Sequence, residues 1–576
     1  MNKFTNTFCE KTEKLKNKLL AGRTFAELAE ERRESLCAGF AAFISVCDVQ
    51  QRARVFRCAA ADPEEAWKGA VEAAEKAVAL DDINPLWIKA DITAKSERKT
   101  LSEVVEKIAG GFNEFFRRGI AFDEEMRTAL IEAEMNGNRV ISYKKKTLEL
   151  AKVNKYLAAQ SLPTLTEFPE TLILFDCDSA FCDEKGEVYE LYGEGHRCGR
   201  RKVDGMDKET ALRVISTSSE YLSMQVGLDG KFDYGYYPIF HKEIPGYNIL
   251  RHATSIWSLI CAYRLTGDKF TLRQAEAAIG YMVSNTFYKY PHVEGKDNVV
   301  YLADKALNEV KIGGSGVAIV MLTEYMDAAG NDKYVQLCRD IGNGILELFD
   351  KRDGSFFHVL NYPSLSPKDK FRTVYYDGEA TFGLCRLYGL TGEQKWLDAA
   401  KMAADRFIRE NYTVHRDHWV AYAMNELTKY VPEDKYLSFG LMNANVNLQK
   451  IYKRATTYHT YLELLCVTFE LYDRIVSQKL KCFYLEKFNA EFFVKTIFHR
   501  AEYMLNGYAY PEYVMYFKYP ETALGAFFVR HDGYRIRIDD IQHFCGAYYS
   551  FYRNFDKLEA LRKSFENKSQ NRGNTP

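Results

Sequence analysis

Three stretches of the sequence share one pattern: AYRLTGDKF (262–270), EYMDAAGNDKY (324–334) and RLYGLTGEQKW (386–396). Each has a glycine at the same place, and Gly267, Gly330 and Gly392 are 63 and 62 residues apart. A glycine between two helical patterns typically ends the first helix in a left-handed conformation, and a charged residue begins the next helix. A second set of glycine turns lies between them: GLDGKFDY (227–234), VEGKDNVVY (293–301) and RDGSFFH (352–358). The chain therefore repeats a unit of two helices and a loop.

The repeat predicts six helical hairpins, because residues 209–575 span 367 positions, close to six periods. The first helices of the pairs are expected to begin near Glu209, Phe270, Lys333, Glu393, Pro432 and Glu486. The second helices are expected to begin near Tyr247, Lys311, Tyr375, Arg416, Ala455 and Arg537. Six stacked pairs close into a double ring, the (α/α)6 toroid. The second set is apolar nearly all round, as in IWSLICAY and AIVMLTEY, which predicts the inner ring, whereas the amphipathic first set predicts the outer ring.

Composition narrows the class of protein. The chain has 576 residues, of which 47% are hydrophobic, so it can form two or three domains with large cores. A net charge of −1 indicates no general attraction to nucleic acid or anionic membrane. The polar first twenty residues and the absence of a long apolar run predict neither a signal peptide nor a membrane span. The 13 cysteines are scattered without a C-x-x-C pair, which indicates reduced thiols and a cytoplasmic protein.

The fold class is predicted to be mainly α, with four segments. Residues 1–168 are expected to form a largely helical domain of unknown role, from TFAELAEERRESLCAGFAAFISV (24–46), PEEAWKGAVEAAEKAVAL (63–80) and residues 99–135. Residues 169–208 alternate around the turn EKG and predict a β-hairpin linker. The toroid is placed at 209–560, with short β-hairpins, and a polar flexible tail at 561–576. In the first segment Arg117, Arg118, Glu132 and Glu134 could form a polar site, or could be solvated or paired surface charges.

Polar residues recur where the inner helices are expected to begin. The six openings are YNILRHAT (247–254), KIGGSGVA (311–318), YYDGEATF (375–382), HRDHWVAY (415–422), TTYHTYLE (456–463) and RIDDIQHF (537–544). Five of them contain His, Asp or Glu. Capping and the helix dipole can explain any single one. Because the inner-helix N-termini of a ring converge, their coincidence predicts a functional cleft at that mouth.

At these residues the chain resembles the (α/α)6-toroid carbohydrate enzymes. That superfamily includes six-hairpin glycosidases, N-acylglucosamine 2-epimerases and the C-terminal domain of glucuronyl C5-epimerases. The local likeness to the last group rests on GKFDYGYYP (230–238), YNILRHAT (247–254), LTGD (265–268) and YYDGEA (375–380). The resemblance implies an enzyme of bacterial surface-polysaccharide metabolism that hydrolyses or epimerises an acidic or amino-sugar glycan. No complete catalytic set of one family is present, so a glycan-binding or scaffold toroid without catalysis is the alternative.

The catalytic residues expected on these grounds are Glu379, Asp377, His418, His252, Asp540 and Tyr236. Glu379 is the candidate general acid of a hydrolase, because burial raises the pKa of a glutamate, and its partner carboxylate would come from another repeat. In an epimerase, Tyr236 would exchange a proton at the sugar carbon, or two histidines would act as opposed acid and base.

Further residues are expected to bind the sugar: Tyr234, Tyr237, His241, Asn248, Arg251, Tyr376, Asp417, Trp419, His459, Arg537, Gln542 and His543. Arg251 and Arg537 could hold a carboxylate, and Trp419 could stack on a sugar ring. His415 and His418 have a spacing that suits a metal, but no third ligand is evident nearby, so neither a metal nor another cofactor is expected. The expected partner is a sugar or glycan, and the oligomeric state stays open.

Overall fold

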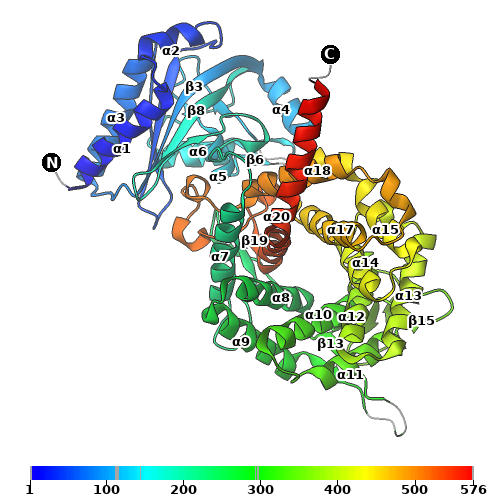
Figure 1. Ribbon diagram of the computed structural model, residues 1–576. Coiled ribbons are helices and arrows are strands. Elements are labelled where there is room, and N and C mark those ends of the chain that lie inside the picture. Colours follow the sequence, from blue (N-terminus) through cyan, green and yellow to red (C-terminus); the bar gives the residue numbers. More distant parts are fainter. Residues whose placement is uncertain (1–2, 111–115, 143, 292–293, 295–296, 574–576) are drawn as a thin grey trace. The chain divides into compact units, whose positions relative to one another are not determined.

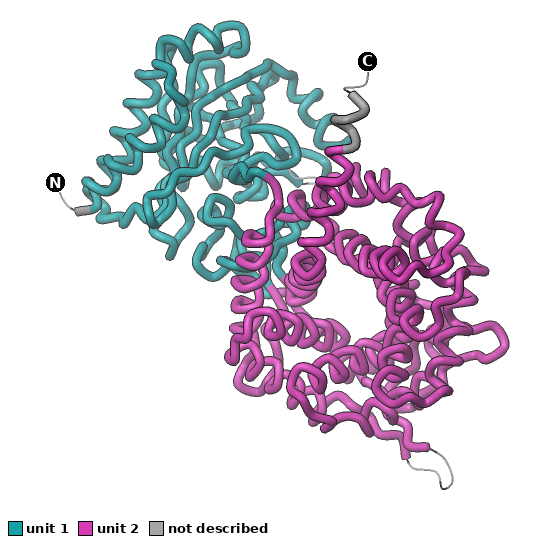
Figure 2. Tube along the Cα trace, in the orientation of Figure 1, with its two compact units in different colours: residues 1–204, 236–243, 506–536 teal, residues 205–235, 244–505, 537–576 magenta. Residues whose placement is uncertain are grey.

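The computed structural model describes residues 3–110, 116–142, 144–291, 294 and 297–573. The chain divides into two compact units, each built from separate segments of sequence (Figure 2). Unit 1 comprises residues 1–204, 236–243 and 506–536, and unit 2 comprises residues 205–235, 244–505 and 537–576. The segment predicted as a linker is therefore almost wholly part of unit 1, and two later segments also belong to that unit.

Unit 1 is built on an antiparallel sheet of seven strands, in the order β2-β1-β3-β8-β4-β5 with β9 paired to β8. The strands are β1 (Phe40–Cys47), β2 (Arg54–Ala60), β3 (Trp87–Thr100), β4 (Gly119–Ala121), β5 (Ala129–Leu130), β8 (Thr171–Cys182) and β9 (Val188–Leu191). Its helices are α1 (Lys3–Leu20), α2 (Phe25–Arg32), α3 (Pro63–Leu80), α4 (Leu101–Gly110), α5 (Glu132–Gly137), α6 (Leu150–Ala159) and α19 (Pro511–Val514). Strands β6 (Ile141–Ser142) and β7 (Thr147–Leu148) form a separate hairpin.

The prediction of a largely helical N-terminal domain is wrong. Every residue of β1 is buried and only Ser45 in its sequence FAAFISVC is polar, so periodicity cannot distinguish such a strand from a buried helix. The predicted helix at 63–80 is confirmed as α3, where Asp62 caps the first turn. Residues 99–135 contain α4, β4 and β5 rather than one helical run, and residues 111–115 lie outside the described part. The predicted hairpin at 169–208 is present as β8–β9, but β8 is a central strand of the sheet.

The acidic residues noted in the first segment have partners within the protein, and Glu134 is buried while Glu132 is half-buried. Glu134 accepts from Arg57 at 2.5 Å and from the hydroxyl of Tyr156 at 2.6 Å. Glu132 accepts from the side-chain amide of Asn136 at 2.9 Å, and burial raises its pKa to about 7. These groups stabilise the packing of α5 against the sheet.

Unit 2 is a double ring of helices (Figure 1). The inner ring consists of α8 (Ile249–Thr266), α10 (Ile312–Ala329), α12 (Tyr375–Thr391), α14 (His418–Tyr430), α17 (Thr460–Ser477) and α20 (Ile538–Gly573). Each inner helix packs on the next, and α20 closes the ring against α8. The outer helices are α7 (Lys208–Met224), α9 (Lys269–Asn285), α11 (Val335–Glu347), α13 (Gln394–Arg409), α15 (Asp434–Asn445) and α18 (Ala490–Met504). The six predicted hairpins and the inner and outer assignment are confirmed.

The glycine turns have the predicted geometry. Gly267, Gly330 and Gly392 adopt φ values of 70°, 63° and 70°, and each donates its N–H to the carbonyl four residues earlier. A residue with a side chain is strained in this conformation, so glycine ends each of these three inner helices, α8, α10 and α12, at a fixed point. Asp268 then caps α9 by accepting from the backbone of Phe270 and Thr271. The glycine repeat in the sequence therefore marks the C-terminal ends of successive inner helices.

Short strands decorate unit 2. One sheet has the order β12 (Phe287–Lys289), β13 (Val300–Asp304), β14 (Glu309–Lys311), β17 (Val359–Asn361) and β18 (Pro367–Asp369). Also in unit 2, β15 (Phe349–Asp350) pairs with β16 (Ser355–Phe356), whereas the hairpin of β10 (Gly235–Tyr237) and β11 (Lys242–Glu243) belongs to unit 1 apart from Gly235. A short strand, β19 (Ile536–Arg537), precedes α20. The predicted flexible tail at 561–576 instead continues α20 to Gly573, and residues 574–576 lie outside the described part.

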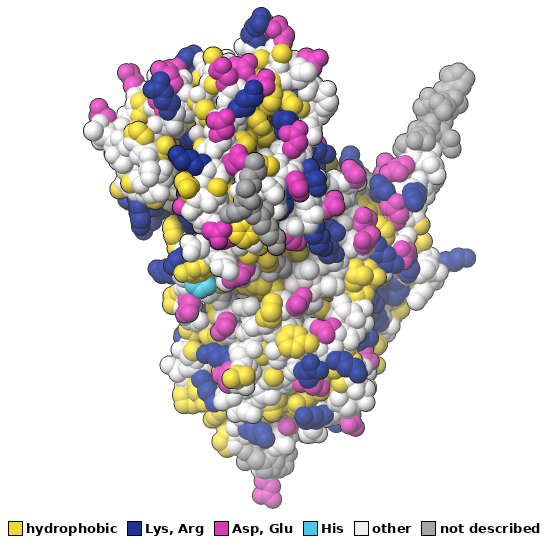
Figure 3. Space-filling model, turned by 90° about the vertical axis from the view of Figure 1, so that its left-hand side faces the viewer, with side chains coloured by type: hydrophobic (Ala, Val, Ile, Leu, Met, Phe, Trp, Pro, Cys, Tyr) yellow, Lys and Arg dark blue, Asp and Glu magenta, His cyan; other side chains and the backbone are white. Residues whose placement is uncertain are grey.

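On the face shown in Figure 3, acidic and basic side chains are interspersed, in keeping with the net charge of −1. No described helix has an apolar stretch of the length needed to cross a bilayer.

Candidate active site in the helical ring

The first turns of the inner helices of unit 2 are joined by side-chain contacts. Arg251 of α8 lies 3.3 Å from Asp539 of α20, and His543 of α20 donates to Glu463 of α17 at 2.8 Å. His418 of α14 completes the series, 3.8 Å from the same carboxylate. We define the histidine cluster as His418, His459, Glu463, Asp539, Asp540 and His543. Polar side chains predicted from separate repeats are thus brought together by the ring.

His418 is a buried imidazole without a hydrogen bond. Its side chain is 3% exposed, and among the described residues neither ring nitrogen has a hydrogen-bond partner. Burial, followed by the neighbouring His543 and His459, lowers the pKa of His418 well below its usual value. The ring therefore stays neutral at physiological pH and keeps a nitrogen lone pair available. A buried polar group without a hydrogen bond costs about 1–3 kcal/mol of folding stability, so a functional role would explain why this imidazole is present.

His543 lies beside His418 in the opposite electrostatic environment. The two ring centroids are 5.2 Å apart. Burial alone would lower the pKa of His543, but the Glu463 carboxylate, with Asp539 and Asp540, raises it above its usual value. Nδ1 of His543 donates to Oε2 of Glu463, which leaves Nε2 on the other side of the ring, 3.8 Å from Asp539. The cluster thus holds one imidazole that favours the neutral form and one that favours the cation.

Asp540 and Asp539 are engaged by arginines. Arg537 donates to Asp540 through Nε and Nη2, each at 3.1 Å, and to Asp539 at 3.0 Å. Arg251 pairs with Asp539 and donates to the hydroxyl of Tyr234. Both guanidinium groups predicted to bind a sugar carboxylate therefore already have carboxylate partners within the protein.

His459 stacks on the same cluster. Its ring is parallel to that of His543 at 4.7 Å, and Nε2 lies 3.9 Å from Asp540. Burial lowers the pKa of His459, and Nδ1 has no hydrogen-bond partner among the described residues. Three of the predicted histidines, His418, His459 and His543, are therefore in contact.

Glu379 is held in the wall of the ring by the glycines of α10. A Cβ on Gly313 would lie 1.9 Å from its Oε2, and one on Gly316 would lie 2.3 Å from its backbone oxygen. Only glycine leaves room at these two positions, which explains the opening KIGGSG. Glu379 is 3% exposed, and among the described residues its Oε2 has no hydrogen-bond partner. Burial first, then Asp417 and Asp539, raises the pKa of Glu379 well above its usual value, so the group favours the protonated form.

Asp417 caps the first turn of α14 beside the cluster. One oxygen accepts from the backbone N–H of Trp419 at 2.9 Å, and the other has no hydrogen-bond partner among the described residues. Burial raises its pKa to about 7. Trp419 packs on His418 with ring centroids 5.0 Å apart and is buried, so it forms part of the wall.

Asp377 has a structural environment although it is only two residues from Glu379. It accepts from Tyr412 at 2.8 Å and from Arg406 at 3.2 Å, and it contacts His358 at 3.2 Å. Consecutive helical positions differ by about 100°, so the two carboxylates point in different directions. With these partners supplied by the protein, Asp377 ties α12 to α13, and its contacts give no support to the predicted catalytic role.

Two predicted residues of α8 stabilise the fold. His252 contacts the hydroxyl of Tyr247 through Nδ1 at 2.6 Å and the carbonyl of Ala278 through Nε2 at 3.0 Å. Both ring nitrogens are occupied and burial lowers the pKa to about 4, so the contacts of His252 give no support to its predicted acid–base role. Asn248 caps α8 through the backbone of Leu250.

Tyr236, Tyr237 and His241 belong to unit 1 and contact other residues of that unit. The hydroxyl of Tyr236 donates to the carbonyl of Thr522 at 2.7 Å, and His241 packs edge-on against Tyr236 and Tyr519. Arg139 lies over the ring of Tyr237. The proton-transfer role predicted for Tyr236 therefore has no support from the contacts of unit 1.

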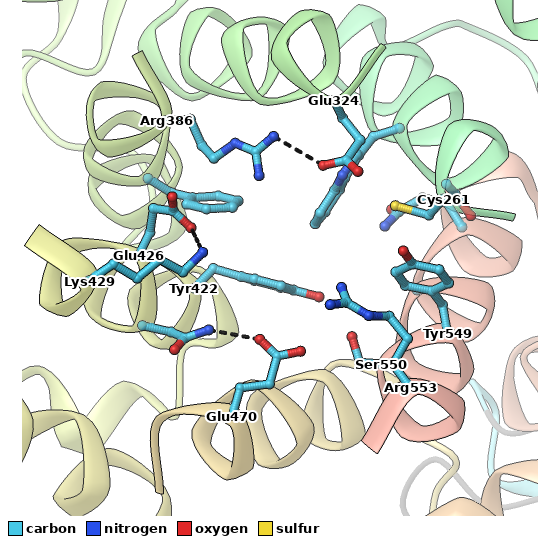
Figure 4. Close-up of a pocket in the computed structure, with 16 residues that line it drawn as sticks. Cys261, Glu324, Arg386, Tyr422, Glu426, Lys429, Glu470, Tyr549, Ser550 and Arg553 are labelled. Atoms are coloured by element: carbon cyan, nitrogen blue, oxygen red, sulfur yellow. Dashed lines mark hydrogen bonds and ion pairs between the residues drawn. The ribbon is translucent and has the colours of Figure 1, made fainter. Parts of the chain in front are cut away.

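The remaining predicted residues line the interior of unit 2. Tyr376 packs against His358 with ring centroids 5.5 Å apart. Gln542 is 1% exposed and lines a cavity in the interior of the ring (Figure 4). The cavity volume is about 100 Å³, and all six inner helices contribute to its lining. Its charges form pairs, as between Arg386 and Glu324 at 3.1 Å.

The size of this cavity suits water rather than a sugar. Small-molecule sites occupy about 300–1,000 Å³, whereas one water takes about 30 Å³ of liquid volume. Oδ1 of Asn425 and Oε1 of Gln542 have no hydrogen-bond partner among the described residues, and bound water would supply one. Tyr422 joins this region to the cluster through a contact of 3.5 Å with Glu463.

One group within the cluster has the spacing of metal ligands. Ligand atoms of His418, Glu463 and His543 lie within 4.8 Å of one another. Two imidazoles and a carboxylate could hold a divalent ion such as Zn²⁺. The expectation of no metal considered His415 as the second ligand, whereas the structure supplies His543 and Glu463 from other helices.

The sequence prediction missed Glu463. It lies one turn after His459 in TTYHTYLELL, among the buried residues at the start of α17. A carboxylate four residues after a histidine in such a buried segment was the available signal.

The sequence matches no protein-family model and no curated protein. Among solved structures, cellobiose 2-epimerase from Bacillus thermoamylovorans is 12% identical, with 59% of this chain and 99% of that chain covered and a TM-score of 0.46. A D-mannose isomerase is 12% identical, with 60% and 98% covered and a TM-score of 0.45. A GH76 α-mannanase from Bacteroides thetaiotaomicron is 11% identical, with 62% and 98% covered and a TM-score of 0.43. At these scores the likenesses support no functional argument, and the double ring rests on its own helix contacts.

Proposed function

We propose that the protein is a carbohydrate-active enzyme that epimerises or isomerises a sugar by proton transfer in the histidine cluster. The observation that carries the proposal is the pairing of His418, buried without a hydrogen bond, with His543, held by Glu463 at 2.8 Å. Adjacent titratable groups whose environments favour opposite protonation states are suited to act as base and acid. The sugar as substrate comes from the motif resemblance of residues 230–238, 247–254 and 375–380 to toroid carbohydrate enzymes.

The reaction we propose needs only proton transfers. Neutral His418 takes the proton from the carbon next to the carbonyl of an open-chain sugar. The electrons of that C–H bond form a C=C bond to the carbonyl carbon, and the C=O π electrons move to the carbonyl oxygen. Glu379, protonated because of its raised pKa, donates a hydrogen bond to the resulting enediolate oxygen. A proton from His543 on the opposite face of the same carbon, with re-formation of the C=O bond, gives the epimer, and exchange with water then restores both imidazoles. Return of the proton by His418 to the former carbonyl carbon, while the neighbouring hydroxyl proton moves to the enediolate oxygen, gives the isomer.

The ion pairs of Arg251 and Arg537 with Asp539 indicate which class of sugar the site could bind. An acidic sugar would have to displace Asp539 from Arg251 or Arg537 to form a bidentate contact. A neutral or amino sugar makes no such demand. We therefore favour a sugar without a carboxylate, while the setting in surface-polysaccharide metabolism and the cleft at the mouth stay predictions from sequence.

The test is deuterium incorporation. Purified protein is incubated in deuterated water with a panel of neutral, amino and uronic sugars, followed by proton NMR and mass spectrometry. We expect deuterium at the carbon next to the carbonyl of an uncleaved sugar. His418→Gln and His543→Gln should each lower the rate roughly 100- to 10,000-fold, as for loss of a general acid or base. His499→Gln is the matched control, because His499 lies on the outer helix α18 and contacts the carbonyl of Tyr452.

Hydrolysis is the second candidate, favoured by the carboxyls of Glu379 and Asp417. Each has a raised pKa and, among the described residues, one oxygen without a hydrogen-bond partner. A glycosidase needs two carboxyl groups beside the scissile bond, one protonated as the acid and one ionised as the base or nucleophile. New reducing ends without deuterium on carbon, abolished by Glu379→Gln, would replace the epimerase proposal. A folded protein that binds the panel and changes no sugar would favour the non-catalytic alternative.

A further inference from the structure

Unit 1 contains a pocket large enough for a metabolite, apart from everything assigned to the ring. Its volume is about 330 Å³, at the lower end of the 300–1,000 Å³ typical of small-molecule sites. It lies between the C-terminal end of α1, Arg32 at the end of α2, and strands β8 and β9, with Lys202 just beyond β9. The cavity in the ring, at about 100 Å³, lacks this capacity.

The charges that line the pocket are mainly basic. Lys18, Arg23, Arg32 and Lys202 contribute four positive charges, while Asp178 and Glu190 contribute two negative charges. The lining therefore carries a net charge of +2, since four minus two is two. A pocket with low-dielectric walls and a net positive lining concentrates anions.

Not all of these cations are equally available. Arg32 pairs with Asp178 and also donates to the carbonyl of Ala94 at 3.3 Å, and Lys202 pairs with Glu190. Lys18 is exposed and forms no hydrogen bond or ion pair with the described residues. Its ammonium group is therefore free to meet an incoming anion.

The end of α1 does not oppose an anion. The last carbonyls of a helix carry partial negative charge, which would repel one. Here Arg23 donates to the carbonyl of Leu20 through Nε at 3.0 Å and to that of Leu19 through Nη2 at 3.3 Å. Arg23 also pairs with Glu31 at 2.5 Å, outside the lining, so its charge is partly offset. The guanidinium neutralises the helix end.

Apolar side chains complete the lining. Leu19 and Ala21 provide carbon surface beside the charged groups, and the buried Ala180 and Leu191 lie beneath them. A ligand that matches this pocket has an anionic group and a carbon skeleton, and an inorganic ion alone would leave the apolar surface uncovered. A phosphate monoester carries about −1.5 to −2 charges at pH 7, which matches the net charge of the lining better than a single carboxylate does.

We propose that this pocket of unit 1 binds a small phosphorylated metabolite of the size of a sugar phosphate, with Lys18 and Arg32 at the phosphate. The site lies wholly within unit 1 and does not depend on the function proposed for the ring. It gives unit 1, whose role the sequence left open, a ligand-binding function.

The test is calorimetric titration of the full-length protein with three probes: glucose 6-phosphate, glucose and inorganic phosphate. We expect saturable binding of glucose 6-phosphate that weakens with added salt, because charge pairs are screened. Glucose should give no binding, and inorganic phosphate should bind more weakly than the ester. Equal binding of glucose and its phosphate, or no binding of the phosphate, would overturn the proposal.

Two variants locate the site. Lys18→Gln should weaken glucose 6-phosphate binding by roughly fivefold or more, because it removes a charge-assisted contact. Asn17→Glu should weaken it further by placing a negative charge on the exposed lining. Lys16→Gln is the matched control on α1, since Lys16 pairs with Glu13 and does not line the pocket. Binding unchanged in both lining variants, or weakened equally in the control, would refute this location.

Discussion

Glu463→Gln tests the acid–base assignment most directly. The change keeps the shape of the side chain but removes the charge that holds His543 at 2.8 Å. That charge is one cause of the raised pKa of His543, so the variant should hold the proton less tightly. A hydrogen bond to a charged group contributes about 1.5–3 kcal/mol, and loss of that amount in the transition state lowers kcat roughly 10- to 150-fold.

The pH profile distinguishes this cause from a general loss of structure. In the native protein, activity needs neutral His418 and protonated His543, so it should fall at low pH as His418 gains a proton and at high pH as His543 loses one. Glu463→Gln should move the alkaline limb of kcat to lower pH and leave the acid limb in place. The assay is the rate of deuterium incorporation between pH 4 and 10. An alkaline limb that stays where it is would refute the assignment of His543 as the acid.

A control separates this effect from the loss of any buried carboxylate. Glu309 is buried in unit 2 and is paired with Arg372 at 2.7 Å, far from the cluster in sequence. Glu309→Gln should lower the melting temperature without moving either limb of the pH profile. If both variants shift the profile equally, the cause is loss of stability.

Three further predictions follow from the site. Asp417→Asn keeps the helix cap but removes a carboxyl whose pKa rises to about 7 on folding. This carboxyl lowers the free energy of unfolding by about 4 kcal/mol above pH 7 and by little at pH 4. Urea unfolding should therefore show the variant gaining stability over the native protein as pH rises. Gly313→Ala should lower stability by about 1–3 kcal/mol through overpacking against Glu379, a loss that Glu379→Ala in the same chain should relieve, as thermal unfolding would show. Zn²⁺ should inhibit the enzyme by binding His418 and His543. EDTA should leave the activity unchanged. Loss of activity with EDTA and its return with metal would show instead that the reaction uses an ion.

The ring could be predicted because its determinants are local. Glycines in the left-handed conformation end three inner helices, and their spacing of about 62 residues appears directly in the sequence. The predicted openings at Tyr375, Arg416 and Arg537 lie within two residues of the observed starts of α12, α14 and α20. Closure of six hairpins then follows, because each inner helix must bury an apolar surface on both sides.

The sheet of unit 1 could not be predicted in the same way. FAAFISVC is apolar at every position but Ser45, because all eight residues of β1 are buried. Such a run lacks the alternation that marks a half-buried strand. β1 pairs with the next strand β2 and with β3, and β3 pairs with β8 from a distant part of the chain, so the register of the sheet depends on long-range pairing.

Sequence by itself determined which residue types occur at the inner-helix openings, and the tertiary structure decided which of them meet. Glu379 faces Gly313 while Asp377 turns to Arg406, because two residues on a helix differ by about 200° in direction. Glu463 joins His418 and His543 only after α14, α17 and α20 have packed together. The physical reason is that helix ends are set by local backbone conformation, whereas the direction of a side chain within the ring depends on the rotation and depth of every neighbouring helix.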